Sequence, residues 1–236
     1  MPLAYSWYRR IDFSTTFRLG QGTGVGERLL KRMGRWLGYV VGVVLLSAGL
    51  WMVAFEAYLL LESWSLAAQL TEADKQKLKA DFLAVPFWIV LLTGAVTPAI
   101  AEEFFFRGFV LSAFRSKLSA YRSVLFSSLL FGLFHVIAGS VLSIEKFLPT
   151  LILGVALGYV AIRTGSLWPG ILLHTLHNGL VFSMSRFTEQ DLAKWFGDDT
   201  KHIPVSWLSG GGIAIALGIA VLFISSQRKP IHEDLI

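Results

Sequence analysis

The chain has 236 residues, of which 54% are hydrophobic and only 16% charged, and its mean hydropathy is +0.60. This composition excludes an ordinary soluble domain and predicts an all-α, polytopic bundle of transmembrane helices. The net charge of +5 does not indicate a nucleic-acid partner, because the basic residues flank apolar segments and point to the lipid bilayer instead. The absence of cysteine excludes disulfides, thiolate metal ligands and a cysteine nucleophile.

Residues 1–35 are basic, and we expect them to form an arm on anionic lipid headgroups. Residues 36–226 form one transmembrane domain, and residues 227–236 form a tail. The apolar segments in this domain predict about six membrane spans, at 36–61, 85–114, 123–141, 147–162, 167–184 and 205–225. A polar connector with a surface helix follows the first span, and a mixed-charge loop precedes the last.

Lys and Arg residues are distributed unevenly between the two sides of the predicted membrane domain. One side receives thirteen of them and the other seven. Because cytoplasmic loops carry the excess of positive charge, this bias places both termini in the cytoplasm. No cleavable leader is apparent, and the compact loops suit a bacterial inner membrane.

The most informative stretch lies inside the second predicted span, where Glu102, Glu103 and Arg107 interrupt an apolar run. An acidic or basic residue at mid-bilayer costs roughly 2.5–3.5 kcal/mol, so such residues usually pair and serve a function. Glu103 and Arg107, four residues apart on a helix, are expected to form a structural ion pair. Glu102 is rotated by about 100° and lacks that partner. Pro98, one turn earlier, disturbs the helix and exposes backbone carbonyls.

Two further predicted spans carry polar residues at a matching depth. His135 lies in the third span, and His174 and Asn178 lie one helical turn apart in the fifth. Counted from the predicted cytoplasmic turns, Glu103, His135 and His174 all lie roughly 16–20 Å inside the membrane. Each alone has a structural interpretation, such as an interhelical hydrogen bond. Their joint burial without a function, however, would cost several kcal/mol.

This set of residues supports two chemistries. In one, Glu102 is a general base that activates water, His135 orients that water, and His174 and Asn178 stabilise the oxyanion. In the other, Glu102, His135 and His174 bind Zn²⁺ or another divalent metal that activates the water. The helical H-E-x-x-H signature is absent, so the metal version lacks its most common sequence support.

The motifs E-E-x-x-x-R (Glu102 to Arg107), F-x-x-x-H (Phe131 to His135) and H-x-x-x-N (His174 to Asn178) resemble those of the CAAX protease and bacteriocin-processing family, CPBP or Abi. The resemblance extends over about residues 85–185, the motif core. It implies an intramembrane endopeptidase related to the Ras-converting CAAX endopeptidase, of glutamate or metalloprotease type. It also implies that Glu102, His135, His174 and Asn178 are catalytic and that Arg107 is structural. His177 is not part of the motif and is assigned no catalytic role.

The expected partner is therefore a peptide or protein substrate in the membrane, of which a prenylated CAAX tail is one example. A non-catalytic membrane scaffold or a bacteriocin self-immunity protein is the main alternative, because the same pocket suits peptide recognition. A proton pathway is a third interpretation, which would require Glu56 in the first span as well as Glu102.

Overall fold

The computed structural model describes residues 25–61, 63, 70–138, 143–187, 189–196 and 202–226. Within these ranges every regular element is a helix, which confirms the predicted all-α class. Most of the predicted basic arm, the tail at 227–236 and the end of the third predicted span at 139–141 lie outside the described residues.

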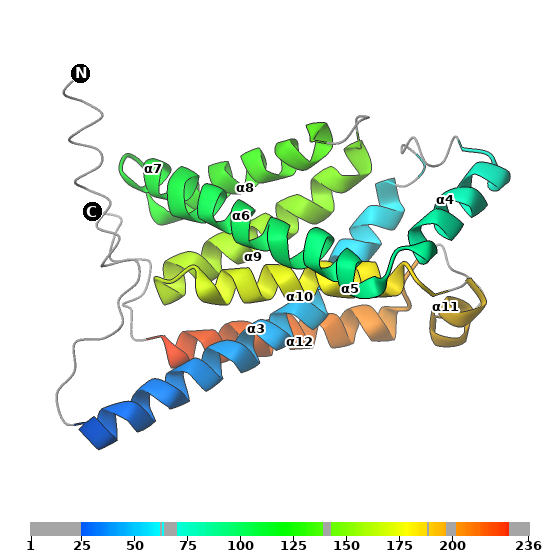
Figure 1. The fold of residues 1–236 in the computed structure, drawn as a ribbon. Helices are drawn as coiled ribbons and strands as arrows, with labels where there is room; N and C mark the ends of the chain where they lie inside the picture. Colours follow the sequence, from blue (N-terminus) through cyan, green and yellow to red (C-terminus); the bar gives the residue numbers. More distant parts are fainter. Residues whose placement is uncertain are drawn as a thin grey trace.

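The helices run back and forth along one bundle (Figure 1). In the described part of the chain, five helices are long and apolar enough to cross a membrane, which makes this a multi-pass membrane protein. These spans are Leu29–Leu61 in α3 (Val25–Leu61), Phe87–Arg115, Ala120–Ile137 (α8), Ile144–Thr164, which contains α9 (Phe147–Thr164), and Val205–Ser225 (α12).

The sequence predicted one span more than this. The fifth predicted span is a helix, α10 (Trp168–Met184), but it has only 17 residues. At ~1.5 Å per residue it is ~25 Å long, shorter than the ~30 Å hydrocarbon core. By length and composition, the described residues therefore contain five of the six predicted spans, and a membrane span at α10 stays a prediction.

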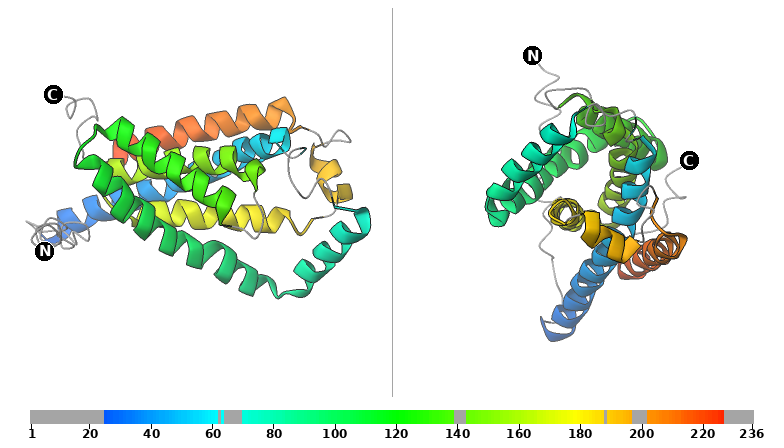
Figure 2. Two further views of the ribbon diagram at one scale, coloured as in Figure 1. Left: turned by 90° about the horizontal axis from the view of Figure 1, so that it is seen from above. Right: turned by 90° about the vertical axis from the view of Figure 1, so that its right-hand side faces the viewer.

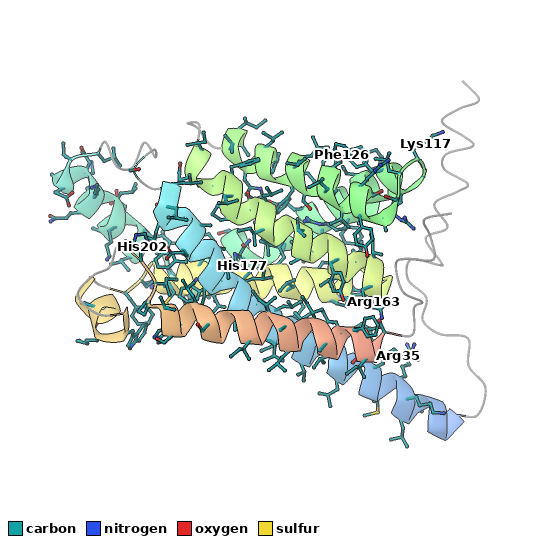
Figure 3. All side chains as sticks on the ribbon, turned by 180° about the vertical axis from the view of Figure 1, so that it is seen from behind. Arg35, Lys117, Phe126, Arg163, His177 and His202 are labelled. Atoms are coloured by element: carbon teal, nitrogen blue, oxygen red, sulfur yellow. The ribbon has the colours of Figure 1, made fainter. Side chains whose placement is uncertain are left out.

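The path of the chain shows what α10 connects. Arg163, at the end of α9, donates from Nη2 to the carbonyl oxygen of Phe223 at 3.3 Å, near the end of α12. The start of α12 lies at the opposite end of the bundle, where Glu56 of α3 accepts the N–H of Ile203 at 2.8 Å. Figure 3 shows Arg163 and His202 at these two ends. Helix α10 therefore carries the chain from one end of the bundle to the other.

The segment from residue 87 to residue 115 is an unbroken but irregular helix. Two π-helical segments, η3 (Leu91–Val96) and η4 (Phe104–Val110), flank α6 (Thr97–Glu103). Pro98 has no N–H to donate to the carbonyl oxygen of Gly94. The turn before Pro98 is wider than an α-helical turn, and the N–H of Thr97 donates to the carbonyl oxygen of Leu92, five residues earlier. The disturbance expected at Pro98 thus takes the form of π-helical turns.

The core lies where α3, η4, α8, α9, α10 and α12 meet. Its buried residues include Val43, Leu46, Phe106, Phe131, Leu157, Leu173 and Leu222. Glycines bring α3 and α12 into close contact, since a Cβ on Gly218 would lie 2.8 Å from the carbonyl oxygen of Gly42. Small residues allow the same close approach in membrane helix pairs generally.

The connecting segments confirm one expectation and correct two. The surface helix is present as α4 (Glu72–Ala84), capped by Thr71, and it meets the next helix at a corner at Pro86 (Figure 2). The mixed-charge loop contains a further helix, α11 (Glu189–Phe196), that the sequence analysis missed. Helix α3 begins at Val25, so the last part of the predicted arm is helical and continuous with the first span.

Candidate active site

Helix α6 ends on two adjacent carboxylates in different surroundings. The side chain of Glu103 is 1% exposed and that of Glu102 is 18% exposed. Arg107 Nη1 donates to Glu103 Oε1 at 2.8 Å, so the predicted ion pair is present and fully buried. Arg107 Nη2 also donates to the carbonyl oxygen of Gly154 on α9 at 3.1 Å. The pair therefore joins the helix of residues 87–115 to α9, and its charges offset each other in a dry environment.

Glu103 has a second partner, which the sequence analysis did not assign. His174 Nδ1 lies 3.1 Å from Glu103 Oε1, and both side chains are 1% exposed. An ionised carboxylate only accepts hydrogen bonds, so we assign the proton to Nδ1 of His174. Glu103 consequently fixes the orientation of the His174 ring, as carboxylates do for catalytic histidines.

His135 is fixed in a comparable way by its own helix. Its Nδ1 lies 2.9 Å from the carbonyl oxygen of Phe131, one turn earlier on α8. A carbonyl oxygen has no proton to donate, so Nδ1 of His135 carries the hydrogen. The remaining nitrogen, Nε2, points away from the helix backbone and toward Glu102.

Glu102 lies between the two imidazole rings. Its Oε2 atom is 3.6 Å from His135 Nε2 and 3.8 Å from His174 Nε2. These distances agree with the prediction that α6, α8 and α10 present polar groups at one depth. Both imidazoles in their neutral form turn a lone pair toward a carboxylate oxygen that is itself buried and without a hydrogen-bond partner. Three acceptors facing one another require a donor between them.

Asn178 lies one turn beyond His174 on α10 and contacts a different element. Its Nδ2 donates to the carbonyl oxygen of Gly94 at 3.4 Å. Gly94 is the residue that Pro98 deprives of its regular helical donor. The carbonyl opened by Pro98 thus faces this region, as expected, and Asn178 satisfies it with one of its two amide hydrogens.

The metal alternative receives no support from this geometry. Among the described residues, no group of three or more histidine, aspartate or glutamate side chains is arranged to hold a metal ion. Metal ligation by Glu102, His135 and His174 therefore stays a prediction.

Two other polar residues, the buried His177 and the partly exposed Glu56, lie outside this cluster. His177 is 5% exposed and lies on α10 where α3 packs against it (Figure 3). Glu56, required for a proton pathway, instead holds the segment before α12: its Oε1 is 2.7 Å from His202 Nδ1, and its Oε2 accepts the Ile203 N–H. Glu56 therefore has a structural explanation at the end of the bundle.

The exposure of the site is one-sided. The side chains of Glu102 and His135 are 18% and 23% exposed, whereas that of His174 is 1% exposed. A molecule reaching the site from the surface therefore meets α6 and the last turn of α8 first, and α10 forms the closed side.

A multi-pass helical membrane protein with a buried cluster of carboxylates and imidazoles is the class that this fold and site define. Residues 84–180 match the family described as "Type II CAAX prenyl endopeptidase Rce1-like". That segment contains all three motifs, and the match confirms its resemblance to the CPBP family of intramembrane proteases. Searches of curated proteins and of solved structures returned no match.

Proposed function

We propose that the protein is an intramembrane endopeptidase in which Glu102 activates a water molecule to cleave a peptide bond. The observation that carries the proposal is the approach of two imidazole Nε2 atoms to one orphaned carboxylate oxygen, at 3.6 and 3.8 Å. A water molecule offers two hydrogens to such a group of acceptors, and it becomes a nucleophile when one of them is removed.

The reaction follows from these roles. Glu102 takes one proton from water while His135 Nε2 accepts the hydrogen bond of the other, and the water oxygen attacks the carbonyl carbon of the scissile bond. The free amide hydrogen of Asn178 donates to the resulting oxyanion. The C–N bond then breaks as the protonated Glu102 returns its proton to the leaving amine. The products are a carboxylic acid, which then loses its proton to water, and a free amine, and Glu102 is again a carboxylate.

His174 has a conditional role in this scheme. While Nδ1 donates to Glu103, a neutral His174 presents only a lone pair at Nε2, and both hydrogens of the attacking water are already engaged by Glu102 and His135. It donates to the oxyanion, the role expected from the family resemblance, only after taking up a second proton. The Glu103 carboxylate, 3.1 Å away, supplies the negative charge that such an imidazolium requires.

Membrane topology and substrate access belong to the same proposal. Helix α10 connects opposite ends of the bundle, so we count it as a sixth span with short flanking segments, inside a membrane domain at 36–226. Basic residues gather at the end where α3 begins and α12 stops, among them Arg35, Lys117 and Arg163 (Figure 3). By the positive-inside rule we expect that end to face the cytoplasm, with both termini on the same side. A membrane-bound peptide, prenylated or not, reaches Glu102 from the exposed side of α6 and α8, in a bacterial inner membrane.

The test compares three forms of the purified protein mixed with native membranes, followed by mapping of new protein N-termini. Glu102→Gln removes the base with almost no change in shape. Glu56→Gln is the matched control, because its side chain is 19% exposed against 18% for Glu102 and lies outside the site. New N-termini are expected from the wild type and from Glu56→Gln, and none from Glu102→Gln.

Other outcomes separate the alternatives. Identical N-termini from all three folded proteins would refute the assignment of Glu102 and favour a non-catalytic scaffold or immunity protein. Loss of activity in both variants, with proton uptake into vesicles also lost, would favour a proton pathway through Glu56. Addition of a chelator to the active wild type then tests the metal prediction.

A further inference from the structure

Phe131 lies at the centre of the polar cluster although it has no polar side-chain atom. Its ring is 0% exposed and is surrounded by charged or polar groups on several sides. The ring centroid lies 4.4 Å from that of His135 and 5.7 Å from that of His174, the latter in an edge-to-face arrangement. The guanidinium carbon of Arg107 lies 4.4 Å from the same centroid.

These contacts give a second connection between parts of the site that also meet at Glu102. Arg107 and His174 are joined through Glu103, whereas the Nδ1 hydrogen bond of His135 goes to its own helix. The Phe131 ring fills the space between these two groups and contacts both. A flat, rigid ring with two side-chain torsions fixes such a separation better than an aliphatic side chain of similar volume.

We infer that Phe131 is a positioning residue, whose ring sets the separation and tilt of the His135 and His174 imidazoles so that both Nε2 atoms face Glu102. Its effect on catalysis is indirect, through the two histidines, and this part of the inference rests on the proposed endopeptidase function. The effect on ring orientation does not depend on that function.

Phe106 provides a matched control. It is 3% exposed, packs edge-to-face on Phe131 at 5.0 Å, and contacts Phe134 at 5.7 Å. Its ring is farther from Arg107, at 5.9 Å against 4.4 Å for Phe131. Phe106→Leu therefore removes a comparable buried ring from the same aromatic cluster, without removing the ring that lies between the histidines.

The first readout needs no substrate. Histidine-labelled protein in micelles, with signals assigned through His135→Ala and His174→Ala, reports the tautomer and environment of each imidazole by NMR. We expect Nδ1-protonated rings for both histidines in the wild type and in Phe106→Leu. In Phe131→Leu, which keeps the backbone carbonyl that binds His135, both signals should shift and the His135 ring should sample more than one tautomer.

The second readout is catalytic. Because an error of about 1 Å in placement can cost about 100-fold in rate, we expect kcat of Phe131→Leu to fall about 10- to 100-fold with KM nearly unchanged. The kcat of Phe106→Leu should stay within about threefold of the wild-type value, because Phe106 lies farther from the catalytic atoms. If Phe131→Leu does not fold, Phe131→Met, which keeps the volume but not the flat ring, replaces it in both measurements.

Two results would overturn the inference. One is a folded Phe131→Leu whose His135 and His174 signals match those of the wild type. The other is an equal loss of kcat in Phe131→Leu and Phe106→Leu, which would make Phe131 an ordinary core residue. If no protein form cleaves any substrate, the proposed function fails, but the NMR comparison still decides whether Phe131 orients the rings.

Discussion

Glu103 has both a structural and a positioning role, and a double-mutant cycle with Arg107 separates them. Arg107→Met leaves Glu103 as a buried carboxylate without its cation, and Glu103→Leu leaves Arg107 as an uncompensated buried charge. Each single change removes one partner of a fully buried pair joined at 2.8 Å. Breaking such a pair typically costs about 3–5 kcal/mol, because the remaining charge stays in a low-dielectric environment.

The double variant Glu103→Leu/Arg107→Met should behave differently. Replacing both charges by apolar side chains of similar size removes the desolvation cost along with the attraction, so we expect a loss below about 2 kcal/mol. The hydrogen bond between Arg107 and the carbonyl of Gly154 and that between Glu103 and His174 are still lost, at about 1 kcal/mol each. Activity should remain absent in the double variant, because His174 has lost the carboxylate that orients its ring.

The assay is equilibrium unfolding of the four proteins by SDS titration in mixed micelles, together with the N-terminal mapping described above. A positive coupling, with the double variant more stable than either single variant, supports a buried ion pair. The reasoning is refuted if the two single losses simply add in the double variant. Recovery of activity along with stability would show that Glu103 matters only as the partner of Arg107, and not for orienting His174.

Two further predictions concern glycines whose neighbours have little room. A Cβ at Gly170 would lie 3.2 Å from Glu103 Oε2, so Gly170→Ala should displace that carboxylate and lower both stability, by about 1 kcal/mol, and activity. Gly179→Ala on the same helix, where the nearest atom would be 3.9 Å away, is the control and should be neutral or slightly stabilising in the same SDS titration. Gly49→Ala should loosen the α3–α12 contact, because the added Cβ would overlap the carbonyl oxygen of Gly211, at a cost of about 1–3 kcal/mol. Gly212→Ala, which meets nothing within 4 Å, should unfold at the wild-type SDS fraction, and equal losses in these two variants would contradict the packing argument.

The limits of prediction are visible in α10 and α11. Hydropathy marked residues 167–184 as a membrane segment, and a helix is present there, but its 17 residues fall short of a typical span. Only the contacts at the ends of α9 and α12 show that this helix runs the length of the bundle. The helix at 189–196 was not predicted, because a polar, mixed-charge sequence is also typical of a loop. Only the structure shows that Trp195 packs against Phe187.

The sequence alone determined those features that depend on spacing within one helix. An apolar chain in a bilayer must form helices, because backbone groups without hydrogen bonds are costly in lipid. The interval of four residues predicted the Glu103–Arg107 pair, because the helical period puts both side chains on one face and an unpaired charge is costly in lipid. Similar numbers of residues from the predicted cytoplasmic turns also predicted that Glu103, His135 and His174 lie at one depth.

Only the tertiary structure decided which atoms meet across helices. Four contacts depend on how α6, α8 and α10 are rotated and tilted against one another. They are the hydrogen bond from His174 to Glu103, the approach of both Nε2 atoms to Glu102, the position of the Phe131 ring between the two histidines, and the contact of Asn178 with Gly94. A difference of a few residues in helix phase would turn the same side chains away from the site. Packing in the folded bundle fixes that phase, and sequence spacing within each helix does not contain it.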